Sequence, residues 1–272
     1  MGLKFCSIAS GSSGNSYLVK SDNTNILIDA GISGKRICDG AGLCGVSPEN
    51  IDGILVTHEH TDHIKSLRMM SRKAKNGEIF TSEGTAYAIF EKMPALREKL
   101  VIKEGSFAVG DIEVRPFQLS HDAEDPVGFT LSSGSRRVTI ITDTGVFSRE
   151  MVEEAAKSDL LVLEANHEVN ILHCGPYPYE LKRRILSDVG HLSNETSAEF
   201  IYEMNEFRKN LGDDKPEQEP RILLAHLSRE NNSPMQAVLT IKNRLFEEDM
   251  IIGRDFQMDV ASHDRMGKLL EV

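Results

Sequence analysis

The stretch His58-Glu59-His60-Thr61-Asp62-His63 decides how this chain of 272 residues is interpreted. It follows Ile54-Leu55-Val56, an apolar run that is typical of a buried β-strand and that begins after the turn-forming pair Asp52-Gly53. Imidazole nitrogen and carboxylate oxygen are ligands of Zn²⁺, and they also suit Mn²⁺ or Fe²⁺. A strand that ends in so many of these groups predicts a metal site at the edge of a sheet.

The spacing divides these side chains into two groups. His58 and His60 are two residues apart, so in an extended segment they point the same way and can share one ion, while Glu59 points away. Asp62 and His63 are adjacent at the start of an expected helix over residues 62–75, and they face elsewhere. The divergence fits two ions. The alternative, a solvated polar loop, does not explain why the cluster follows an apolar strand directly.

More ligand-type residues follow other apolar, strand-like runs. They are Asp29 after residues 25–28, His121 after residues 112–119, Asp143 after residues 138–142 and His226 after residues 221–225. Each one alone reads as an ordinary strand-end residue. Together they repeat one arrangement, which is how a sheet carries an active site along one edge.

The order of these residues resembles that of the metallo-β-lactamase-fold hydrolases. The matching motifs are, in order, Asp29, His58-x-His60-x-Asp62-His63, His121, Asp143 and His226. Four further stretches look like the YycJ (WalJ) branch, bacterial cytoplasmic proteins regarded as DNA exonucleases. These stretches are residues 10–16, 164–167, 190–194 and 225–232. Gly190-His191 and His226-Leu227-Ser228 are also similar to the tRNA-processing ribonuclease Z branch.

The resemblance implies a role for each matching residue. His58, His60 and His121 would hold a first divalent ion, zinc or manganese. Asp62, His63 and His226 would hold a second, and Asp143 would bridge both. Asp29 would orient a ligand histidine or the loop that carries the His58–His63 motif. Two such ions lower the pKa of a bridging water towards ~7 and clamp a phosphodiester, and Asp62 would also orient the attacking hydroxide.

A leaving oxygen needs a proton or charge stabilisation, and two further histidines are candidates. His191 is favoured, because Gly190 and Ser193-Asn194 around it indicate a loop that opens a helix over residues 194–209. A helix N-terminus binds phosphate readily, so Ser193 and Asn194 are candidate substrate contacts. His167 supports the site from behind or simply packs after the apolar run at residues 160–163.

Charge sets a limit on the substrate. The formal net charge of −11 argues against a general polyanion-binding protein. Basic residues nevertheless cluster at Arg72-Lys73-Ala74-Lys75, at Arg136-Arg137 and at Lys182-Arg183-Arg184. The last cluster lies on an expected helix over residues 178–187, a few residues before Gly190-His191. We therefore expect Lys182, Arg183 and Arg184 to contact a phosphate backbone, although such clusters are often only solvated faces.

Composition predicts a single cytoplasmic domain over residues 1–272. The chain is 40% hydrophobic, enough for a substantial core, and no apolar stretch is long enough to span a bilayer. Met1-Gly2-Leu3-Lys4 runs straight into an expected strand, which leaves no room for a signal peptide. The four cysteines lack zinc-finger spacing and are expected to be reduced thiols.

The expected fold is α/β, a four-layer αββα sandwich of the metallo-β-lactamase type. Helices are expected over residues 33–41, 62–75, 83–92, 148–157, 178–187, 194–209 and 233–247, and residues 211–220 read as a polar surface loop. Twelve strands are expected, among them residues 25–29, 52–57, 137–142, 159–164 and 221–225.

The expected function is that of a two-metal phosphodiesterase, a DNA exonuclease acting from 5′ ends. RNA is a variant substrate. The alternative is a small-molecule hydrolase of the same fold, acting on a thioester, a lactone or a cyclic phosphodiester. A non-enzymatic regulatory protein ranks last, because no ligand position is missing. The oligomeric state is left open.

Overall fold

The computed structural model describes residues 2–212, 216 and 218–272, and it divides into two compact units. The first unit comprises Met1–Gln118, Ala123–Arg136 and Ser262–Val272, and the second comprises Leu119–Asp122 and Arg137–Ala261. The loop expected at residues 211–220 therefore falls partly outside the described residues. The single domain over residues 1–272 stays a prediction.

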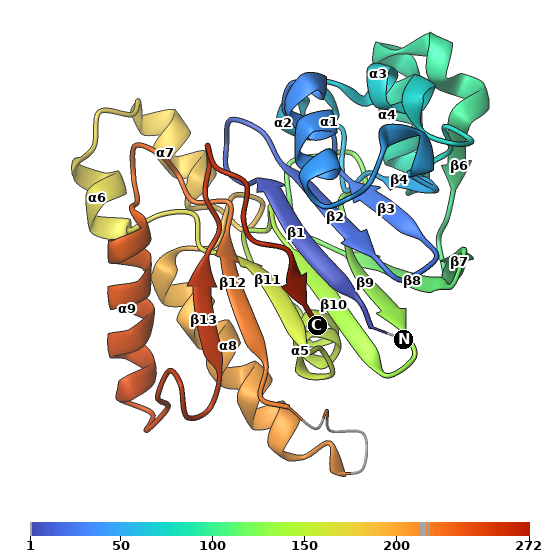
Figure 1. Cartoon of the computed structure of the whole chain (residues 1–272). Helices are drawn as coiled ribbons and strands as arrows, with labels where there is room; N and C mark the ends of the chain where they lie inside the picture. The colour runs from blue at the N-terminus through green and yellow to red at the C-terminus, as the bar shows by residue number, and fades with distance from the viewer. Residues whose placement is uncertain (1, 213–215, 217) are drawn as a thin grey trace. The chain divides into compact units, whose positions relative to one another are not determined.

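The first unit is built on a seven-stranded mixed sheet with the order β14-β1-β2-β3-β4-β5-β6 (Figure 1). The strands are β1 (Lys4–Ala9), β2 (Ser16–Lys20), β3 (Asn25–Ile28), β4 (Gly53–Leu55), β5 (Ile79–Thr81), β6 (Leu100–Ile102) and β14 (Leu270–Glu271). Pairing is antiparallel from β14 to β3 and parallel from β3 to β6. An antiparallel ladder of β7 (Phe107–Val109), β8 (Ile112–Gln118) and β9 (Val127–Ser133) belongs to the same unit.

Short helices connect the parallel strands of the first unit, as parallel pairing requires. They are α1 (Gly34–Leu43), η1 (Pro48–Asn50), α2 (Thr61–Ile64), α3 (Leu67–Lys73), α4 (Glu83–Lys92) and η2 (Pro94–Lys99). Apolar side chains of strands and helices, such as Leu27, Ile54, Ile37 and Leu67, form one buried cluster. This core fixes the loops that leave the strand ends.

The single helix expected over residues 62–75 is wrong, because α2 and α3 are separate helices. Ser66 lies between them with φ −109° and ψ 11°, outside the helical region. Its amide donates to the Ala30 carbonyl at 2.8 Å, and its Oγ donates to the Ile32 carbonyl at 2.6 Å. These contacts with the segment after β3 replace helical hydrogen bonds, so the break has a tertiary cause.

The second unit contains four parallel strands, β10 (Arg136–Ile141), β11 (Leu160–Glu164), β12 (Arg221–Ala225) and β13 (Gln257–Val260). Their register pairs Ile141 with Leu163, and Glu164 with Ala225, so the carboxyl ends of β10, β11 and β12 align. The helices are α5 (Arg149–Ala156), α6 (Val169–Cys174), α7 (Tyr179–Ile185), α8 (Asn194–Lys209) and α9 (Pro234–Phe246). Helix α8 packs against both α5 and α9 (Figure 1).

The other expected helices are confirmed to within two residues at each end. Helix α6, strand β7 and the two-residue strand β14 were not expected from the sequence, because all three are too short to show a clear hydrophobic period. None of the described helices is long and apolar enough to cross a membrane.

Candidate metal centre

In the first unit, the candidate ligands His58 and His60 lie on the loop between β4 and α2, and Asp62 and His63 lie in α2 itself. The register that pairs Ile28 with Leu55 brings Asp29, directly after β3, beside the start of this loop. The buried carboxylate of Asp29 accepts hydrogen bonds from the Thr57 amide at 3.0 Å and from Nδ1 of His63 at 2.7 Å. Asp29 therefore lies behind a candidate ligand histidine, which is the place that the resemblance implies.

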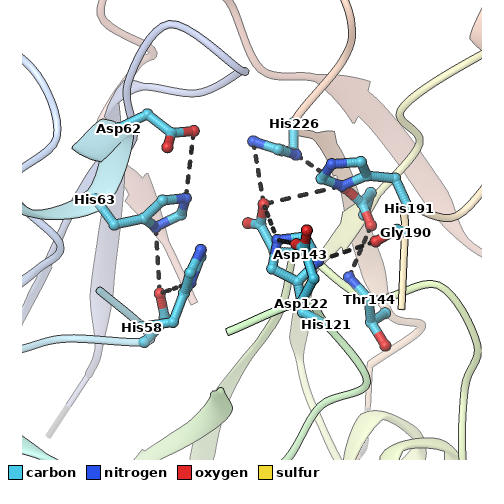
Figure 2. Close-up of polar contacts among 12 residues, drawn as sticks. His58, Asp62, His63, His121, Asp122, Asp143, Thr144, Gly190, His191 and His226 are labelled. Carbon is cyan, nitrogen blue, oxygen red and sulfur yellow. Dashed lines mark hydrogen bonds and ion pairs between the residues drawn. The ribbon is translucent and has the colours of Figure 1, made fainter. Parts of the chain in front are cut away.

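The hydrogen bond to Asp29 fixes the tautomer of His63. With its proton on Nδ1, the lone pair of His63 is on Nε2, which accepts a hydrogen bond from Nδ2 of the Asn15 side chain at 3.0 Å and lies 3.7 Å from Oδ2 of Asp62. The ring of His58 has its centroid 4.1 Å from that of His63 and 4.6 Å from that of His60. Figure 2 shows His58, His63 and Asp62 gathered in this way. The four ligands expected from this unit are thus brought together.

Two residues that the sequence analysis did not single out hold this loop in place. The Asn15 amide donates to the Asp62 carbonyl at 2.8 Å, and the Gly31 amide donates to the Asn15 carbonyl at 2.9 Å. A Cβ atom at Gly31 would lie only 1.5 Å from the Asp62 carbonyl oxygen, so no other residue fits there without displacing the loop. Asn15 lies within the glycine-serine stretch at residues 10–16, and that stretch was the feature of the sequence that could have pointed to it.

In the second unit, Glu164 lies at the centre of the candidate site. Oε1 of this fully buried carboxylate accepts hydrogen bonds from Nδ1 of His191 and of His226, both at 2.8 Å. Oε2 accepts from the amides of Thr144 and Leu192, both at 3.1 Å. Burial alone would raise the pKa of Glu164, but the charges of His191 and His226 and the hydrogen bonds from their rings hold that pKa well below its ordinary value. Glu164 is therefore an ionised acceptor at neutral pH.

Glu164 was not among the site residues expected from the sequence. The sequence pattern that could have revealed Glu164 is the same as that of Asp143, namely a carboxylate at the end of a buried apolar strand. Only the parallel register of β11 and β12 shows that its side chain meets His226.

His121 and His226 both present a lone pair on Nε2. Nδ1 of His121 lies 3.0 Å from the Gly190 carbonyl, which can only accept, so Nδ1 carries the proton. Burial lowers the pKa of His121, so the ring is neutral at pH 7. His226 donates its Nδ1 proton to Glu164 in the same way.

These lone pairs face carboxylate oxygens. Nε2 of His226 lies 3.4 Å from Oδ1 of Asp143, and Nε2 of His121 lies 3.9 Å from the same atom (Figure 2). Two acceptors at such distances repel unless a cation lies between them or a proton is added. Neutral imidazoles whose Nδ1 protons are held by a carboxylate or carbonyl are typical metal ligands. This donor set therefore fits a divalent ion.

Backbone strain marks three of the strand ends. Asp29, Asp143 and His226 have φ values of 57°, 65° and 53°, in the left-handed region that residues other than glycine rarely adopt. Such strain tends to be concentrated at functional sites. Here it turns the chain sharply after β3, β10 and β12.

His167 is buried, with 1% of its surface exposed. It forms a β-bridge with Ser193, and its ring nitrogens find no hydrogen-bond partner among the described residues. Burial lowers the pKa of His167 to about 4, so the ring is neutral at pH 7. This position is compatible with both expected roles of His167, which are to support the site from behind or simply to pack in the core.

The expected substrate contacts are less open than the sequence suggests. Ser193 caps α8 as expected, since its Oγ accepts from the Thr196 amide at 3.1 Å. The buried Asn194 amide donates to Glu168 at 3.0 Å and to Asn232 at 3.1 Å. Both side chains therefore already have partners in the protein.

The three cations of the basic cluster on α7 have different partners and different exposure. The ammonium group of Lys182 donates to the carbonyls of His173 and Gly175, both at 2.7 Å. The guanidinium of Arg184 grips both carboxylate oxygens of Asp122, beside His121. Arg183 remains 65% exposed, with Glu180 at 3.7 Å. It is the most accessible cation of the three.

The fold and the site define the class of the protein. A family model described as "Beta-lactamase superfamily domain" matches residues 24–211, so the chain belongs to that superfamily. It superposes on the metallo-β-lactamase fold protein YhfI from Bacillus subtilis with a TM-score of 0.68 at 14% identity, covering 98% of this chain and 99% of the other. The expected α/β class and metallo-β-lactamase fold are confirmed.

Within that class, the chain is similar to proteins named as exodeoxyribonucleases. It is 35% identical over 277 residues to "Exodeoxyribonuclease WalJ" of Streptococcus pneumoniae, covering 100% of this chain and 99% of the relative. It is 36% identical over 261 residues to "Exodeoxyribonuclease YycJ" of Bacillus anthracis, covering 95% of each. The resemblance to the YycJ (WalJ) branch is confirmed.

Proposed function

We propose that this protein is a two-metal phosphodiesterase that degrades DNA exonucleolytically from 5′ ends. The observation that carries the proposal is the identity of 35% with a protein named as an exodeoxyribonuclease, which extends over the full length of both chains. The geometry of the site supports the chemistry, because each unit presents imidazoles and carboxylates at or just after its strand ends.

The proposed ligand set follows the family resemblance. His58, His60 and His121 would hold one divalent ion, and Asp62, His63 and His226 the other, with Asp143 shared. Bound zinc or manganese would supply an activated water and neutralise phosphate charge. In this proposal Asp62, whose side chain is 28% exposed, also orients the attacking water.

His191 is the proposed carrier of a proton to the leaving oxygen. Its Nδ1–H group is held by the ionised carboxylate of Glu164 at 2.8 Å, which aims Nε2 away from Glu164. The same carboxylate would stabilise the imidazolium when Nε2 takes up a proton. The side chain of His191 is 16% exposed, so its ring is accessible from solvent.

Arg183 is the first of the proposed contacts with the phosphate backbone of the substrate. It is the most exposed cation of the α7 cluster, whereas Lys182 and Arg184 also serve contacts within the protein. Ser193 and Asn194 stay proposed contacts through the N-terminus of α8. The proposed site of action is the cytoplasm, where DNA is the substrate.

Digestion of end-labelled linear DNA tests the proposal. The metal-loaded protein, with Zn²⁺ or Mn²⁺, is given DNA with or without a 5′ phosphate, beside the variant Asp62→Ala and the control Asp52→Ala. Asp52 is a carboxylate of the same unit that pairs with Lys75 at 3.1 Å. Mononucleotides released from the 5′ end by wild type and by Asp52→Ala alone support the proposal, and no release from wild type refutes it.

A small-molecule hydrolase of the same fold is the second candidate. The formal net charge of −11 favours it, because a strongly acidic protein repels a polyanion. Turnover of a thioester, a lactone or a cyclic phosphodiester in the absence of DNA cleavage would establish this alternative.

A further inference from the structure

A hollow of about 360 Å³ lies in the first unit between the end of α3 and η2. Four cations line it, and none of the described residues that line it is acidic. The cations are Arg68, Arg72, Lys75 and Lys99. This concentration of positive charge stands out in a chain whose net charge is −11. A concave surface of one sign focuses the local field and attracts anions.

The two arginines of the hollow keep their full charge. Arg68 and Arg72 are four residues apart on α3, so they share one face of the helix. Both are exposed, and neither forms an ion pair within the described chain. The ammonium group of Lys99 donates at 2.7 Å to the neutral carbonyl of Asn76, while Lys75 pairs with Asp52 at 3.1 Å. Three of the four positive charges are therefore not neutralised by the protein.

The hollow is separate from the candidate metal ligands of the same unit. The Lys75 amide donates to the Ile51 carbonyl at 3.0 Å, and Ile51 lies just before β4, whereas His58 lies beyond its other end. The extended chain from Ile51 to His58 spans up to about 23 Å, at roughly 3.3 Å for each of the seven residue steps. That length corresponds to about seven steps of a DNA strand at roughly 3.4 Å each.

We propose that this hollow is a phosphate-binding site that holds the backbone of a nucleic acid several nucleotides away from the cleaved bond. The inference rests on the proposed function and adds a second contact to it. Guanidinium groups bind phosphate oxygens through paired hydrogen bonds. The lining contains no aromatic side chain among its described residues, so it grips the backbone and does not stack on bases. Long substrates should therefore bind more tightly than short ones.

The test measures binding to metal-free protein, so it does not depend on cleavage. Fluorescence anisotropy with a labelled 24-nucleotide single strand compares wild type with Arg68→Glu/Arg72→Glu. The control Lys242→Glu/Lys268→Glu makes the same change of charge at exposed lysines outside the hollow. We expect the arginine variant to bind roughly tenfold more weakly or worse at low salt, with a salt slope smaller by about 1.4 for two lost phosphate contacts. The lysine control should stay close to wild type.

Two further measurements identify the ligand. The metal-loaded arginine variant should cleave a dinucleotide as fast as wild type does, because a dinucleotide cannot reach the hollow. Wild type and the arginine variant should bind equally to vesicles that contain phosphatidylglycerol, because Arg68 and Arg72 are not expected to hold a lipid headgroup.

Equal affinity of the arginine variant and the lysine control for the 24-nucleotide strand would overturn the proposal. Vesicle binding that depends on Arg68 and Arg72, without strand binding, would also overturn it, in favour of a lipid headgroup. Failure of the proposed function would be seen separately, as absence of nucleotide release from the metal-loaded protein.

Discussion

Oε1 of Glu164 lies 2.8 Å from Nδ1 of His226 and fixes which ring nitrogen of that histidine carries the proton. The same oxygen accepts from Nδ1 of His191 at an equal distance. One buried carboxylate therefore orients a candidate metal ligand and a candidate proton carrier at the same time. A change at Glu164 should disturb metal binding and turnover together.

Glu164→Gln should lower metal affinity by roughly 10- to 100-fold, because a neutral amide holds the Nδ1 proton of His226 less well. Turnover should fall further than metal loss alone explains, since His191 loses its charged partner too. Metal content after dialysis and nucleotide release under saturating metal measure the two effects. The control is Glu168→Gln, a buried carboxylate that accepts from Asn194 and Thr240 but from no histidine. Equal metal content in the two variants would contradict the orienting role.

Asp29→Asn should lower metal affinity in the first unit by a similar factor, roughly 10- to 100-fold. Asparagine tolerates the left-handed backbone at this position, where φ is 57°, so the fold should survive. The lost charge weakens the hydrogen bond from His63, now 2.7 Å long. Titration of metal-free protein with Zn²⁺ measures the change, and Asp52→Asn, at a half-buried carboxylate of the same unit that pairs with Lys75, serves as the control. An unchanged dissociation constant would remove Asp29 from the site.

His191→Ala should reduce turnover by about 10²- to 10⁴-fold, the usual contribution of a positioned proton carrier. Its metal content should stay at the level of wild type, whereas His60→Ala should lose both metal and activity. Single-turnover rates beside elemental analysis of the same samples separate the two cases. If His191→Ala loses as much metal as His60→Ala, His191 is a ligand instead.

The buried His167 should make stability depend on pH. Its folded pKa of about 4 lies below the ordinary value of 6.5, so the unfolded chain binds the proton more tightly between these values. The free energy of unfolding should therefore fall by about 3 kcal/mol as the pH drops from 7 to 4, and should not change from this cause above 7. His167→Gln should remove that part of the loss. Urea unfolding of both metal-free proteins at pH 7 and pH 4 gives the difference, and parallel losses would refute the assignment.

The strand ends that carry the site could be predicted because their signals are local. An apolar run followed by a ligand-type residue marks Asp29, Asp143 and His226 without any knowledge of tertiary contacts. The cluster at residues 58–63 is visible in the same way. These residues are adjacent in sequence or sit at recognisable boundaries, so periodicity and residue type were sufficient.

Contacts between distant segments could not be predicted in this way. Asn15 meets the loop of Asp62 across 47 positions of sequence, and Glu164 meets His226 across 62. The break between α2 and α3 is likewise caused by hydrogen bonds from Ser66 to Ala30 and Ile32. Each depends on strand register or loop packing, which no local pattern contains.

The close fit of Gly31 against the Asp62 carbonyl has a consequence for how an ion is taken up. The segment from His58 to His63 is joined through backbone hydrogen bonds to the segments around Asn15 and Ala30, so contacts within the protein hold its shape. Little binding free energy then goes into ordering the chain. Such a site is preorganised, and the protein should release its ions to a chelator and accept new ones without refolding.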